Sequence, residues 1–215
     1  MMRVLVLISG RGSNLAALIA ARDAGSLPVE FVAVISNRPQ AGGLELAVAA
    51  GIPTRVVDHR NYAGRAEFDA ALAEAIEAYA PDLVVLAGFM RILTDDFVRR
   101  FAGRMLNVHP SLLPAFPGLE THRRALDEGV RIHGCTVHFV TPSLDHGPIV
   151  VQAAVPVLAD DEVATLAARV LREEHRIYPL AVRWFAEGRL RLEDGRVRVQ
   201  VGAAPAQTLI CPAEG

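Results

Sequence analysis

Short, continuously apolar runs alternate with longer segments of helical periodicity over the first half of this chain. Runs rich in branched residues, such as 4–8 and 83–87, are typical of strands covered on both faces, as in a parallel sheet. The predicted strands are 4–8, 31–35, 54–57, 83–87 and 105–109, and the predicted helices are 15–24, 43–50, 63–79 and 94–101. This alternation predicts an α/β fold with a doubly wound, mostly parallel sheet of the Rossmann-like type.

The second half follows a different pattern. A helix is predicted over 119–128, and the strand-like runs 134–140 and 149–157 have no helix between them, which predicts an antiparallel C-terminal extension of the sheet. The helical segment 162–187 contains Pro179, which we expect to kink or break it. Asp194-Gly195 between the runs 190–193 and 196–201 predicts a hairpin. We expect a single domain over 1–201 and a loose tail over 202–215.

Composition argues against several classes of protein. The formal net charge of -2 gives no basic excess, so no nucleic-acid partner is expected. No apolar stretch approaches the roughly 20 residues of a membrane span. Cys135 and Cys211 lie far apart without a cysteine neighbour, which argues against a disulfide framework or a zinc site and fits a reducing cytoplasm. The sequence has no His-x-His or His-x-x-x-His pair, so no metal cofactor is expected.

Open α/β sheets bind ligands outside the carboxyl ends of their strands, where the strand order reverses. With the order 3-2-1-4-5, the polar or glycine-rich segments 9–14, 88–91 and 107–110 meet at that edge. In the first segment, Gly10 and Gly12 permit a tight turn, and Ser13 and Asn14 are expected to cap the helix that follows. Free N–H groups at a helix start favour an anion such as phosphate, although a plain strand-to-helix turn has the same pattern. The segment matches neither the dinucleotide nor the Walker fingerprint.

Asn107 and His109 lie two residues apart on a predicted strand and therefore on the same face. An amide beside an imidazole suits acyl transfer, because the amide can hold an oxyanion while the imidazole moves a proton. An Asn-x-His pair is more often structural, and its place at the predicted ligand edge is what favours the catalytic interpretation. The loop residue Asp145 is either a turn former or an acid that folds back to His109 and favours its imidazolium form.

The remaining histidines give weaker indications. His138 alternates within a predicted strand and is expected to be a core histidine with satisfied hydrogen bonds. His122 and His133 are expected on a helix surface and in a loop. Cys135 lies in a strand-like run and is expected to pack as a small core residue.

Several blocks of the sequence resemble one family of enzymes. Asn-Val-His-Pro-Ser-Leu-Leu-Pro at 107–114 resembles the signature of the folate-dependent formyltransferases, and 117–126 is similar to the branch that formylates phosphoribosylglycinamide in purine biosynthesis. Blocks 8–15, 86–93 and 138–148 resemble that family's phosphate loop, folate-pocket loop and catalytic aspartate loop. The resemblance runs from residue 4 to about residue 192, with its motifs in the same order.

The resemblance implies a formyltransferase fold, 10-formyltetrahydrofolate as cosubstrate, phosphoribosylglycinamide as acceptor, and no metal. It implies catalytic roles for Asn107, His109 and Asp145. The residues that would contact the ribotide are Gly12, Ser13, Asn14 and Glu174, of which the first three would hold its phosphate. The residues that would contact the folate are Arg65, Met90, Arg91, Ile92, Leu93, Asn107, Thr141, Pro142, Ser143, Leu144 and Asp145. His146 stands where the family often has glycine, which would alter the loop if that residue has a positive φ.

Two other functions stay open. A formyltetrahydrofolate deformylase would use water in place of the amine, and a non-catalytic nucleotide-binding domain could use the same scaffold. A dehydrogenase is disfavoured because the glycine fingerprint and a ribose-binding acid are missing. We expect a cytoplasmic enzyme, either a monomer or a homodimer, whose partners are small molecules and include neither nucleic acid nor membrane.

Overall fold

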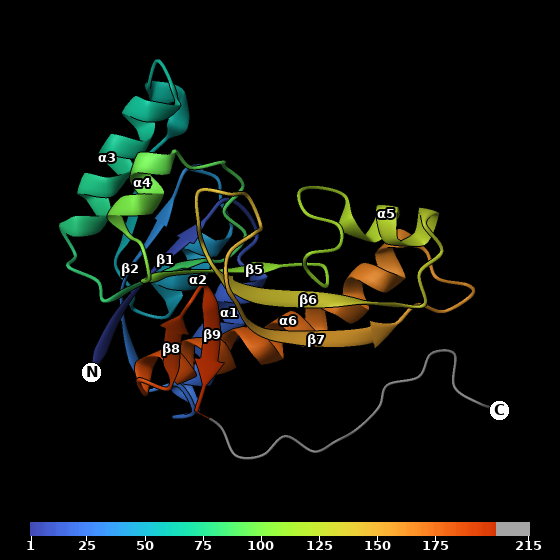
Figure 1. Cartoon of the computed structure of the whole chain (residues 1–215). Helices are drawn as coiled ribbons and strands as arrows, with labels where there is room; N and C mark the ends of the chain where they lie inside the picture. Colours follow the sequence, from blue (N-terminus) through green and yellow to red (C-terminus); the bar gives the residue numbers. More distant parts are fainter. Residues whose placement is uncertain (201–215) are drawn as a thin grey trace.

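Seven strands form one sheet in the order β3-β2-β1-β4-β5-β6-β7 (Figure 1). The computed structural model describes residues 1–200, so the predicted tail at 202–215 lies outside the described residues. The strands are β1 (Met2–Ile8), β2 (Val29–Ser36), β3 (Thr54–Val56), β4 (Leu83–Leu86), β5 (Met105–His109), β6 (Ile132–Phe139) and β7 (Ile149–Pro156). The first five pair in parallel, and β6 and β7 pair antiparallel. The strand order 3-2-1-4-5 and the antiparallel extension predicted from the sequence are both confirmed.

Helices cover both faces of this sheet. They are α1 (Ser13–Asp23), α2 (Gly43–Ala49), α3 (Arg65–Glu77), α4 (Asp95–Arg100), α5 (Thr121–Asp127) and α6 (Val163–Ala186), with a short 3-10 helix, η1 (His59–Asn61). Val4, Val6 and Ile8 of β1 belong to the core that includes residues of α1 and α6. Leu5 and Leu7 belong to the core that includes residues of α3 and α4. Because successive strand residues point to opposite faces, one apolar run supplies both cores.

The long helix α6 runs without a break through Pro179, where the sequence predicted a kink or a break. Residues on both sides of the proline are held against the sheet, because Val170 and Val182 are fully buried. The hydroxyl of Tyr178 shares its proton between the carbonyl oxygens of Leu86 and Leu106, at 2.8 and 3.0 Å. These tertiary contacts offset the helical hydrogen bond that proline cannot donate.

Beyond α6 the chain forms the predicted hairpin, with strands β8 (Leu190–Glu193) and β9 (Arg196–Val199) on either side of Asp194-Gly195. Both turn residues have positive φ, as a tight hairpin turn requires. Within residues 1–200, no helix is both long enough and apolar enough to cross a membrane.

Candidate active site

A cavity of about 760 Å³ opens at the carboxyl ends of β4 and β5. Its walls come from the loop after β4, the end of β5, the loop before α5 and the loop after β6, with Asn14 and Glu174 from two helices. The predicted ligand-edge segments 88–91 and 107–110 therefore lie together, and the segment 9–14 reaches the cavity through Asn14.

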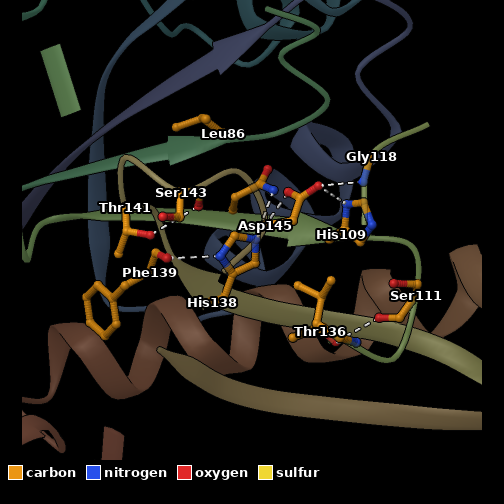
Figure 2. Close-up of polar contacts among 12 residues, drawn as sticks. Leu86, His109, Ser111, Gly118, Thr136, His138, Phe139, Thr141, Ser143 and Asp145 are labelled. Carbon is orange, nitrogen blue, oxygen red and sulfur yellow. Dashed lines mark hydrogen bonds and ion pairs between the residues drawn. The ribbon is translucent and has the colours of Figure 1, made fainter. Parts of the chain in front are cut away.

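His109, the last residue of β5, has both ring nitrogens next to oxygen acceptors. Its Nε2 lies 3.0 Å from the carbonyl oxygen of Phe116, and its Nδ1 lies 3.5 Å from Oδ2 of Asp145 (Figure 2). Because a carbonyl can only accept, Nε2 carries a proton and Nδ1 is the nitrogen that faces the acid. The side chains of His109 and Asp145 are only 7% and 8% exposed. The structure thus brings Asp145 back to His109.

Asn107 lies on the same face of β5 and meets His138 of the neighbouring strand. Its Nδ2 is 3.2 Å from Nε2 of His138, whose Nδ1 is 2.9 Å from the carbonyl oxygen of Phe139 (Figure 2). Burial lowers the pKa of His138, so its ring is neutral, with the proton on Nδ1 and a lone pair on Nε2. His138 therefore accepts from Asn107 and fixes the amide, whose second N–H is available to a ligand oxygen.

Asp145 itself adopts the left-handed backbone conformation, with a φ of 52°. His146 does not have a positive φ; the unusual conformation falls on Asp145, a residue type that tolerates it. Oδ2 of Asp145 also accepts the N–H of Gly118 at 2.8 Å (Figure 2). A Cβ at Gly147 would lie 1.7 Å from the carbonyl oxygen of Phe139, so only glycine fits at that end of the loop.

Asn14 and Glu174 form a second polar cluster in the same cavity. Nδ2 of Asn14 donates to Oε2 of Glu174 at 2.8 Å, and both side chains are buried. Burial raises the pKa of Glu174, and the hydrogen bond from Asn14 partly offsets that effect. Oδ1 of Asn14 is buried without a hydrogen-bond partner among the described residues. The cluster therefore presents acceptor oxygens to a ligand that carries N–H groups.

The predicted cap of α1 by Ser13 and Asn14 is wrong. The N-cap is Gly12, with a φ of 80°, and no side chain of the described residues caps the helix. A Cβ at Gly12 would come within 2.7 Å of the Cα of Gly43, so the turn packs too tightly for any larger residue. Asn14 instead points to Glu174. The first N–H groups of α1 thus have no capping side chain, which is compatible with the predicted anion site.

Some predicted contact residues line the cavity and others do not. Those that line it are Asn14, Met90, Arg91, Ile92, Leu93, Asn107, His109, Thr141, Pro142, Leu144, Asp145 and Glu174. Those that do not are Gly12, Ser13, Arg65 and Ser143. Arg65 is an exposed residue at the start of α3, and the carbonyl of Ser143 closes a turn by accepting from the hydroxyl of Thr141 at 3.2 Å.

His133 does not lie in the predicted loop, and it pairs with His122, a contact that was not predicted. His133 is buried in β6, and not in a loop, because that strand begins two residues before the predicted start. Its Nε2 lies 3.2 Å from Nδ1 of His122, which lines the cavity. Burial lowers the pKa of His122 and lowers that of His133 to about 4. Extending the strand-like run upstream to Ile132 would have indicated this buried pair.

The fold and this site define the class of protein. The formyl transferase family matches residues 2–182, and the chain belongs to that family. Phosphoribosylglycinamide formyltransferase of Escherichia coli (strain K12) is 49% identical to it over 206 residues, which cover 96% of this chain and 97% of that protein.

Solved structures agree with this relationship. The structure of glycinamide ribonucleotide transformylase 1 from Symbiobacterium toebii superimposes with a TM-score of 0.90 at 54% identity, covering 93% of this chain and 94% of that chain. A formyltetrahydrofolate deformylase from Burkholderia mallei superimposes with a TM-score of 0.84 at 32% identity, covering 92% of this chain and 69% of that chain. The chain is therefore more similar to this transformylase than to this deformylase, both in sequence identity and in TM-score.

Proposed function

We propose that this chain transfers the formyl group of 10-formyltetrahydrofolate to the amino group of phosphoribosylglycinamide. The observation that carries the proposal is one cavity that holds two polar clusters. Asn107, His109 and Asp145 supply an oxyanion donor and a proton carrier, and Asn14 and Glu174 supply acceptors for an amine. The names of the Escherichia coli and Symbiobacterium toebii relatives support the same reaction.

The apolar wall of the cavity fits the body of a folate. Met90, Ile92 and Leu144 line the cavity, and each leaves more than half of its surface exposed. Large apolar side chains that stay exposed around a concave site mark a binding surface for an apolar ligand. We assign this wall to 10-formyltetrahydrofolate as a substrate, and the proposed reaction uses no metal.

The cluster of Asn14 and Glu174 fits the amino group of the ribotide. The N–H groups of an amine can donate to the carboxylate of Glu174 and to Oδ1 of Asn14, which has no partner among the described residues. The N-terminus of α1, with Gly12 and Ser13, would hold the phosphate through main-chain N–H groups and the helix dipole.

The chemistry follows from the contacts of Asn107 and His109. The amine nitrogen adds to the formyl carbon, the second N–H of Asn107 donates to the oxyanion that forms, and the positive charge of protonated His109 stabilises it. Asp145 balances the imidazolium charge, while the carbonyl oxygen of Phe116 holds the opposite nitrogen. When the carbonyl re-forms, the bond between the formyl carbon and the donor nitrogen breaks. The proton lost by the attacking amine then passes to that nitrogen, through His109 or water.

The test is folate product formation from 10-formyltetrahydrofolate, with and without phosphoribosylglycinamide. Turnover that requires the ribotide is the expected result. Formate release without the ribotide would identify a deformylase, and tight binding without turnover would identify a non-catalytic nucleotide-binding domain. The cytoplasmic location and the choice between monomer and homodimer stay predictions.

A further inference from the structure

The loop between β5 and α5 holds the proposed catalytic pair through main-chain atoms. Nε2 of His109 donates to the carbonyl of Phe116 at 3.0 Å, and the N–H of Gly118 donates to Asp145 at 2.8 Å (Figure 2). The segment 116–118 therefore touches both members of the pair. Its position sets the distance and angle at which Nδ1 of His109 meets the carboxylate of Asp145.

This segment has an unfavourable backbone. Phe116 and Glu120 have φ values of 53° and 56°, in the left-handed region that residues with a side chain rarely adopt. Such conformations persist only where surrounding contacts fix them. In the described structure, residues 116–120 belong to no helix or strand. Contacts from outside the segment therefore have to hold it in place.

Besides His109 and Asp145, Arg124 of α5 supplies such contacts. Its guanidinium donates to the carbonyl of Pro117, and the same nitrogen lies 3.5 Å from the carbonyl oxygen of Leu119. The guanidinium carbon lies 5.5 Å from the centroid of the Phe116 ring, and that ring packs edge-on against His133 at 5.8 Å. A planar guanidinium with several fixed donors can serve two carbonyls and an aromatic face at once, which a lysine ammonium does less well.

We propose that Arg124 is a positioning residue for proton transfer by His109. It does not line the cavity, and it acts by fixing the main chain that orients His109 and Asp145. The inference rests on the proposed formyl transfer for its kinetic consequence. Because Arg124 contacts none of the residues assigned to substrate binding, its loss is expected to reduce turnover and leave substrate binding nearly unchanged.

The experiment compares Arg124→Ala and Arg124→Lys with Arg123→Ala. Arg123 is the matched control, because it is exposed on the same helix and its side chain makes no hydrogen bond, ion pair or aromatic contact with the described residues. Arg124→Ala is expected to lower kcat about three- to tenfold, with each KM within about twofold, from the loss of charged hydrogen bonds and a cation–π contact. Arg124→Lys is expected to restore part of that loss, and Arg123→Ala to match wild type.

A double-mutant cycle separates positioning from a general loss of stability. In an Asp145→Asn background, Arg124→Ala is expected to lower kcat less than about twofold, because the ion pair that Arg124 aligns has already lost its negative charge. Losses that multiply in the double variant, or an equal loss in Arg123→Ala, would overturn the proposal.

Nitrogen NMR of histidine-labelled protein tests the inference without reference to activity. The Nε2 signal of His109 is expected to move in Arg124→Ala and to stay in place in Arg123→Ala, because only the first change removes contacts that hold Phe116, whose carbonyl accepts from Nε2. An unmoved signal in Arg124→Ala would refute the positioning role. Absence of formyl transfer by the wild-type chain would instead refute the proposed function, and the NMR result would still decide the role of Arg124.

Discussion

Replacing Asp145 with asparagine removes one charge and changes little else. Asparagine has the same shape, accepts the left-handed conformation at φ 52°, and can still accept the N–H of Gly118. At the 3.5 Å between Oδ2 of Asp145 and Nδ1 of His109, two unit charges attract by about 5 kcal/mol at an effective dielectric of about 20. Because the asparagine oxygen retains part of this interaction, we expect a loss of about 2 to 4 kcal/mol, or about 30- to 1000-fold in kcat.

The assay is the rate of folate product formation at saturating substrates, measured across pH, with Tm recorded for each protein. The KM for the ribotide is expected to change much less than kcat, because its amine is assigned to Asn14 and Glu174. A variant of wild-type Tm whose kcat stays within about threefold of wild type would refute the charge-balancing role of Asp145. An equal rise in KM and fall in kcat would move that role from the chemical step to binding.

Three further predictions follow from the same contacts. Asn107→Ala is expected to lower kcat by about 10²–10³, and His109→Ala at least as much, in single-turnover assays of formyl transfer. Burial raises the pKa of Glu174, because the folded protein favours the protonated carboxyl. The stability that this protonated carboxyl allows is fully present below the unfolded pKa and is lost as pH rises through the folded pKa. Glu174→Gln is therefore expected to raise Tm at about pH 8, with no gain at about pH 4, while weakening ribotide binding. Burial lowers the pKa of His133 from 6.5 to about 4, so stability is full above pH 6.5 and falls by at most about 3 kcal/mol as pH drops toward 4. Urea denaturation of wild type and His133→Leu checks this, and an equal acid loss in both would contradict it.

The centre of the sheet was predictable because its inner strands β1, β2 and β4 are buried on both faces. A strand such as β1 has to be apolar at every position, and that pattern survives in the sequence without any knowledge of partners. When strands and helices alternate, the right-handed crossover rule permits only a few strand orders. The edge of the sheet at which ligands bind was therefore predictable as well. The positions of Asn107 and His109 were predictable for this reason, since both lie on a strand that ends at that edge.

The contacts that hold His109 and Asp145, like the details of α1 and α6, were not predictable from the sequence, because they depend on main-chain atoms and on tertiary packing. Phe116 and Gly118 act through a carbonyl and an N–H, which every residue type except proline carries. The predicted cap of α1 was wrong because Gly12 has to pack on Gly43 at the start of α2, a contact between residues that are distant in the sequence. The predicted break at Pro179 was wrong because buried residues on both sides of the proline hold α6 against the sheet.

The antiparallel strand β6 completes the site. In its register with β5, His138 lies opposite Asn107, so the imidazole meets the amide on the same face. A slip of one residue would turn His138 to the other face and leave the amide unheld. Because β6 runs opposite to β5, it ends beside Met105, and the loop that follows has to turn back along β5 to bring Asp145 to His109 (Figure 2). One strand pairing thus fixes the amide, the imidazole and the acid together, and an error in its register would displace all three.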